Sequence, residues 1–128
     1  MTQRRPLTMI SGGVAELPTD DTLYGFPPFV HTETTVSINA VTENFVGNKG
    51  TRFNHASALT FTVPSGLTTA NQPFLLIQMG AGQLSVVAGG GVTIHSAGGN
   101  LKLRGQYSAA TLLPISSDVY LLIGDLVA

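Results

Sequence analysis

The sequence lacks cysteine and tryptophan entirely, and only 10% of its 128 residues are charged. Without cysteine the chain forms no disulfide, no thiolate nucleophile and no cysteine-based zinc site. Seven acidic and six basic residues leave a net charge of −1, which is not the positive field that steers proteins to nucleic acid or to anionic membranes. No apolar run reaches the roughly 18 residues of a transmembrane helix, and no apolar stretch follows the N-terminal arginines to form a secretory signal. We therefore expect a soluble protein, made without export, that binds neither nucleic acid nor membrane.

The side chains that could carry chemistry are few and scattered. His31, His55 and His95 lie in separate segments, without the spacing that would bring two of them to one metal ion. Asp20 and Asp21 are the only adjacent carboxylates, and their Pro-Thr-Asp-Asp-Thr context favours turn capping over acid–base catalysis, with a divalent cation as an open alternative. The serines lack the Gly-x-Ser-x-Gly setting of a hydrolase nucleophile. We expect no catalytic residue, no cofactor and no metal, and so no enzyme.

From Thr32 onward the sequence consists of short runs of β type separated by turn residues. The expected strands are 35–41, 59–63, 74–79, 84–87, 92–94, 101–103, 110–113 and 119–123. The glycine clusters between them lead into strands and not into a helix, which indicates hairpins or bulges and argues against a phosphate loop. About eight strands at spacings near ten residues, without an amphipathic helix, predict an all-β domain over residues 32–128. We expect an antiparallel β-sandwich or a jelly-roll-like barrel.

Residues 1–31 differ from the rest and are expected to form an extended N-terminal arm. Four of the seven prolines lie there, and proline disfavours both helices and central strands. The segment also holds ten large apolar side chains, each worth about 1.5–3 kcal/mol when buried. The arm should therefore pack on its own domain, on a neighbouring subunit or on a larger partner. The residues expected to contact a partner are Arg4, Arg5, Leu7, Tyr24, Phe26 and Phe29.

Two of the expected strands, 74–79 and 119–123, do not alternate between apolar and polar residues. A sheet with one wet face should show such alternation, so both faces of these strands should be covered. One small chain can hardly cover two strands completely, and we expect one face of each to lie at an interface between copies of the chain. The alternative is that both are central strands covered by the chain's own loops. The residues expected at the subunit interface are Phe74, Leu76, Tyr120 and Leu122.

Two stretches of the sequence resemble structural proteins of tailed bacteriophages. Residues 4–23, with a basic pair, a proline, an apolar run, Leu-Pro and Asp-Thr-Leu, resemble an N-terminal or linker segment of such proteins. Residues 53–126 look like a β-rich module of phage fibre and capsid-accessory proteins. The motifs that carry this likeness include Leu-Thr-Phe-Thr-Val-Pro (59–64), Leu-Lys-Leu-Arg-Gly-Gln-Tyr (101–107) and Leu-Leu-Ile-Gly-Asp-Leu (121–126). Such modules often carry a tryptophan in the last strand, where this chain has Tyr120.

The resemblance implies a non-enzymatic component of the virion, commonly a homotrimer, made in the cytoplasm of a bacterial host. Because the chain has room for an arm and one head but not for a fibre shaft, a capsid decoration protein of the cement or head-fibre type is favoured. Its partners would be further copies of itself and the major capsid protein or another virion protein. The alternative is a short tail-fibre or baseplate tip that binds a receptor, with a glycan as ligand, although the sequence offers only three tyrosines as stacking platforms.

Overall fold

The structure is a computed structural model that describes residues 9–10, 13–14, 29–67 and 72–128. Strands make up 53% of the described part of the chain, which contains almost no helix; this confirms the expected all-β class. The strands and 3₁₀ helices are β1 (Met9–Ile10), β2 (Gly13–Val14), β3 (Phe29–Thr34), β4 (Ile38–Asn39), η1 (Thr42–Phe45), β5 (Asn48–Phe53), β6 (Leu59–Val63), β7 (Phe74–Gln78), β8 (Leu84–Ala88), β9 (Thr93–Ser96), η2 (Ala97–Gly99), β10 (Lys102–Leu103), β11 (Ala109–Ser116), β12 (Val119–Gly124) and β13 (Leu126–Val127). The boundary expected between residues 31 and 32 falls inside β3.

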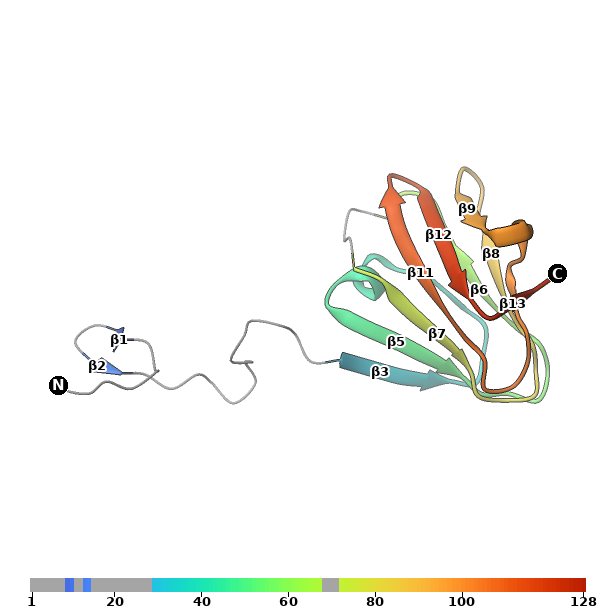
Figure 1. Ribbon diagram of the computed structural model, residues 1–128, viewed down its shortest axis with the longest axis horizontal. Coiled ribbons are helices and arrows are strands. Elements are labelled where there is room, and N and C mark those ends of the chain that lie inside the picture. Colours follow the sequence, from blue (N-terminus) through green and yellow to red (C-terminus); the bar gives the residue numbers. More distant parts are fainter. Residues whose placement is uncertain (1–8, 11–12, 15–28, 68–71) are drawn as a thin grey trace.

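The described strands form two main sheets, and the chain winds between them. One sheet has six strands in the order β3-β5-β7-β11-β12-β9, and the other has five in the order β13-β10-β8-β6-β4 (Figure 1). From β3 to β8 successive strands alternate between the sheets, and neighbours within a sheet run parallel. This is a β-solenoid-like arrangement. The expected antiparallel sandwich or jelly-roll barrel is therefore wrong in its topology, although most of the strands were anticipated.

The second and third coils of the solenoid repeat with a period of 25 residues. Lys49 of β5 pairs with Phe74 of β7, and Leu59 of β6 pairs with Leu84 of β8, so each partner lies 25 positions further along the chain. The corners that connect these strands, 54–58 and 79–83, are consequently equal in length and stack on each other. Such a winding places the side chains of successive coils in rows.

The C-terminal part of the chain ends the winding. The antiparallel hairpin of β11 and β12 lies between β7 and β9 in the six-stranded sheet. In the other sheet β10 runs antiparallel to both β8 and β13. The corner 104–108, which leads from β10 to β11, contacts the corner 79–83, where the side-chain amide of Gln106 donates to the Met79 carbonyl at 3.1 Å. Next to it, the Tyr107 N–H donates to the carbonyl of Gln78 at the end of β7, at 2.6 Å.

A chain of aromatic rings links the two sheets through the core. Phe61 of β6 lies between Phe53 of β5 and Phe74 of β7, at centroid distances of 5.9 and 5.4 Å. Phe45 of η1 continues the chain to Phe74 at 6.0 Å and to Tyr120 of β12 at 5.5 Å. All five residues are buried in one core cluster. Ring pairs of this kind add to the stabilisation from burial alone, so both sheets belong to one packed unit.

Candidate functional site

The four residues expected at a subunit interface lie instead in the protein's own core. Phe74, Leu76, Tyr120 and Leu122 are only 1%, 0%, 3% and 1% exposed. The strands that carry them are apolar on both faces, as the sequence indicates, but the wrong face was assigned to the interface. The apolar residues that could meet a partner are those between them, on the outward side of the same strands.

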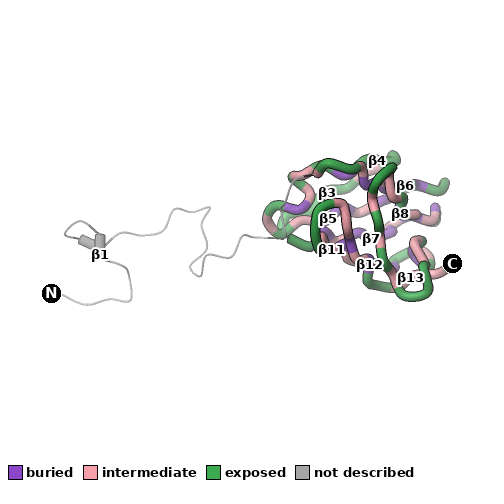
Figure 2. Tube along the Cα trace, turned by 90° about the horizontal axis from the view of Figure 1, so that it is seen from above, coloured by how far each residue is buried: buried purple, intermediate pink, exposed green. Residues whose placement is uncertain are grey.

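These outward residues form a largely apolar face on β7, β11 and β12, with Thr111 as its one hydroxyl-bearing member. Buried positions alternate with half-buried or exposed ones over residues 74–78, 109–113 and 119–123 (Figure 2). The ladder register aligns the outward residues in rows across the sheet. Ile123 is the most open of them, at 54% exposed, and the others are half-buried. We define the outer-face patch as Leu75, Ile77, Thr111, Leu113, Leu121 and Ile123.

No charged residue occupies an outward position on β7, β11 or β12. The charged groups of the sheet's outer side lie at β3 and β5, where Arg52 contacts the His31 ring and the side-chain amide of Asn54 donates to Glu33 at 2.9 Å. Phe29 stacks on His31 with the ring centroids 5.3 Å apart. An apolar centre with a polar margin is the usual anatomy of a protein–protein interface.

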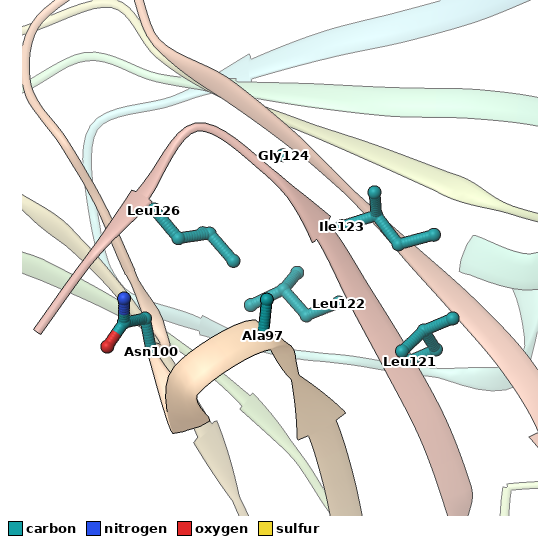
Figure 3. Close-up of a pocket in the computed structure, with 7 residues that line it drawn as sticks. All are labelled: Ala97, Asn100, Leu121, Leu122, Ile123, Gly124 and Leu126. Atoms are coloured by element: carbon teal, nitrogen blue, oxygen red, sulfur yellow. The ribbon is translucent and has the colours of Figure 1, made fainter.

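A cavity of about 290 Å³ opens beside the patch, at the edge of β12 (Figure 3). Ala97, Leu122 and Leu126 gather around it from η2, β12 and β13. Asn100 is the only polar side chain among the lining residues, which include no acid, base or charged group. The cavity can accept an apolar side chain, but it offers no groups for catalysis.

Gln78 is a polar residue on the buried face of β7. It shares the inward face with Phe74 and Leu76 and is 1% exposed, whereas a glutamine at a strand position normally marks the wet side. Both ends of its amide are hydrogen-bonded inside the protein: Nε2 donates to the Gly80 carbonyl at 3.1 Å, and Oε1 accepts from the Leu84 N–H at 3.1 Å. A buried polar side chain is tolerated when it is hydrogen-bonded in this way.

The residues expected to contact a partner fall into two groups. Phe29 is described: it begins β3, is 44% exposed and lies on the outward side of the sheet. Its ring covers Gly50, where an added Cβ would lie 3.1 Å from it. The remaining expected contacts, which lie outside the described residues, are Arg4, Arg5, Leu7, Tyr24 and Phe26.

The described part of the chain contains no group of three or more histidine and acidic residues that could hold a metal ion. Its one ion pair joins Arg104 and Asp125 at 2.6 Å on an exposed corner. The hydrogen bonds from Arg104 and its positive charge lower the pKa of the Asp125 carboxyl. His55 accepts a hydrogen bond from the Ser57 N–H at 2.9 Å, whereas Asp20 and Asp21 lie outside the described residues.

No helix in the described ranges is both long enough and apolar enough to cross a membrane. No protein-family model, no curated protein and no solved structure matches this chain. The fold and the surface therefore define the protein only as an all-β, solenoid-like domain with an apolar, uncharged outer sheet face.

Proposed function

We propose that this chain is a non-enzymatic structural protein of a bacteriophage particle, most simply a capsid decoration protein, which assembles with copies of itself through the outer-face patch. The observation that carries the proposal is the patch itself, an uncharged apolar face in the middle of the six-stranded sheet. Exposed apolar patches of this kind mark interaction sites in soluble proteins. The likeness of residues 4–23 and 53–126 to phage structural proteins supports the assignment to a virion.

The dimensions of the sheet support a subunit interface. Six strands at about 4.8 Å per step span roughly 24 Å, and strands of six residues are roughly 20 Å long. The whole outer face of the sheet is therefore roughly 500 Å², and the three strands that carry the patch supply roughly half of it. The patch is thus the centre of an interface, and its margins must supply the rest of the about 800 Å² that each partner contributes to a standard complex. A neutral face can meet another copy of itself without bringing like charges together. The resemblance implies a homotrimer, and we propose that the three patches face its common axis.

In this proposal the N-terminal arm holds the oligomer on the particle. Arg4, Arg5 and Leu7 would contact the major capsid protein or another virion protein. The role is mechanical: the assembled domain adds interface area between neighbouring capsid subunits. No bound small molecule and no reaction are needed.

A second candidate, the receptor-binding tip of a short tail fibre or baseplate, is favoured by one observation. Tyr107 is 73% exposed and has a backbone φ of 70°, a region that large side chains rarely adopt and that costs of order 1–3 kcal/mol. The turn is held in place by Ser108, whose backbone N–H donates to the Gly105 carbonyl at 3.1 Å. Strain that presents an aromatic ring to solvent is typical of binding sites. Loss of glycan-array binding on Tyr107→Ala, with the fold intact, would promote this candidate.

Immunogold electron microscopy tests the proposed location. Antibodies against the purified chain are applied to intact particles from cells that produce the protein. We expect label over the capsid surface. Label confined to the tail tip would favour the receptor-binding tip over the decoration protein. Particles without label would contradict a role in the virion altogether.

A further inference from the structure

The two margins of the six-stranded sheet differ in shape. One margin is β3, where the outward ring of Phe29 is 44% exposed. The other margin is formed by β9, η2 and the end of β12 that extends beyond β9, and here the cavity of about 290 Å³ opens (Figure 3). Because the outer-face patch is smaller than a standard interface, both margins must take part in assembly. One of them offers a projecting ring, and the other offers a hollow.

The ring and the hollow lie at the same height along the strands. The ladder partners can be followed across the whole sheet, from β3 to β9. One row of partners consists of Val30, Lys49, Phe74, Leu112, Leu122 and Ser96. In the same register Phe29, directly before Val30, is level with Leu121. Both Leu121 and Leu122 line the cavity, so the two features differ in height by no more than about one residue.

This coincidence in height matters for a ring of identical copies. A rotation about an axis that runs along the strands leaves every residue at its own height. In a cyclic trimer the contacts are heterologous, so the β3 margin of each copy meets the margin with the cavity on the next copy. The rotation therefore brings the ring of Phe29 to the neighbour's cavity without a shift along the strands. A two-fold pair would instead bring like margins together.

We propose that the ring of Phe29 in each copy enters the cavity at the end of β12 in the next copy and anchors the oligomer there. The inference rests on the proposed self-association through the outer-face patch, and it names the contact that closes the ring of subunits. Apolar cavities of about 150 Å³ already hold a benzene ring, so a cavity of about 290 Å³ has room for the phenyl group. Its walls are aliphatic, with Asn100 as the only polar side chain.

Neither margin carries a feature that opposes the contact. In the described part of the chain β3 has a neighbour only in β5, and β9 only in β12, so both margins are strand edges, which proteins usually cover or protect. Glu33 and Arg52 are the charged groups near Phe29. The facing elements β9, η2 and β12 contain no carboxylate, lysine or arginine. Glu33 and Arg52 therefore meet no like charge of this kind across the interface.

Disulfide trapping tests the proposal, because the full chain has no cysteine of its own. The test variant is Phe29→Cys with Ala97→Cys; Ala97 lines the cavity and directly follows β9. Within one chain the two positions lie at opposite edges of the sheet, roughly 24 Å apart. A disulfide requires Cα atoms within about 7 Å, so it can form only between copies. After mild oxidation we expect a covalent trimer on a non-reducing gel, in which mass spectrometry finds the peptides around positions 29 and 97 joined.

The matched control for the trapping is Phe29→Cys with Val87→Cys, an exposed position on the other sheet. We expect its cross-linking to be at least about tenfold slower, because only a docked pair has a high effective concentration. Equal rates in the test and control variants would overturn the contact. A covalent dimer formed by Phe29→Cys alone would also overturn it, because it would show that like margins meet.

Sedimentation of variants without cysteine gives a second measurement. Phe29→Ala removes the ring, and Ala97→Leu fills the cavity from an exposed position. We expect each to raise the dissociation constant of the oligomer at least about tenfold, as for an anchor residue of an interface, whereas Val87→Ala leaves it unchanged. If the parent assembles and both variants assemble as tightly, the contact is wrong and self-association through the patch still stands. A monomeric parent contradicts both.

Discussion

Replacing Gly82 by alanine places a methyl group where the backbone of the neighbouring coil already lies. A Cβ at this position would be 1.9 Å from the Ser57 carbonyl oxygen and 2.3 Å from its carbon. Neither is a flexible side-chain end that could move away. The Gly82 N–H donates to the His55 carbonyl at 2.8 Å, so the two corners are also tied together at this point.

Relief of the clash requires the corners to separate by more than about 1 Å, which takes the hydrogen bond beyond its normal range of 2.7–3.2 Å. Overpacking costs about 1–3 kcal/mol, and the lost hydrogen bond adds about 0.5–1.5 kcal/mol. The sum is about 1.5–4.5 kcal/mol, which lowers the melting temperature of a domain of this size by at least about 5 °C.

Thermal unfolding followed by circular dichroism measures the effect of Gly82→Ala. Gly105→Ala is the matched control, because a Cβ there meets nothing within 4 Å and its φ is not positive. We expect the control to remain within about 0.5 kcal/mol of the parent. Equal melting temperatures for the two variants would refute the stacking of the corners and with it the parallel winding.

Three further predictions concern the core, the exposed corner and the arm. Gln78→Leu leaves two buried main-chain groups without partners and should cost about 2–4 kcal/mol in urea unfolding; a neutral effect would contradict the buried amide network. Asp125→Asn should lower the melting temperature at neutral pH. Because the pKa of the Asp125 carboxyl in the folded protein lies below the ordinary 3.8, the difference in melting temperature between parent and variant should persist above pH 3.8 and vanish as the pH falls through the lowered pKa. A difference that does not change with pH would mean that the ion pair with Arg104 contributes nothing. Deleting residues 1–15 should leave the oligomer intact in sedimentation and abolish binding to particles, whereas retained binding would remove the arm's assigned role.

The strand positions were largely predictable from the sequence because alternation and glycine-rich turns are local signals. The expected strands 59–63, 74–79, 84–87 and 119–123 match β6, β7, β8 and β12 closely. The expected strand 35–41 was too long, since only Ile38–Asn39 belongs to a strand, as β4. The first three residues of β3 were predicted to belong to the arm because prolines precede them, but an edge strand tolerates prolines at its start.

The winding and the choice of outward face were not predictable in the same way. A run such as Leu-Ser-Val-Val can form a strand that pairs with its neighbour in either the parallel or the antiparallel direction. Which direction it takes depends on the lengths of the corners and on contacts between residues that are distant in the sequence. The 25-residue offset leaves only a faint sequence trace, chiefly Leu59 with Leu84 and Gly66 with Gly91, whose φ values are both +83°. On β7 the buried Gln78 reverses the usual rule that the polar side faces water.

The mass of the purified chain in solution tests the central claim, self-association through the outer-face patch, most directly. Sedimentation equilibrium over micromolar concentrations compares the parent with Ile123→Glu, on the patch, and Val87→Glu, an exposed position on the other sheet. We expect an oligomer, a trimer, for the parent and for Val87→Glu, and a folded monomer for Ile123→Glu. A parent chain that stays monomeric at every concentration, or an Ile123→Glu variant that assembles as well as Val87→Glu, would contradict the account.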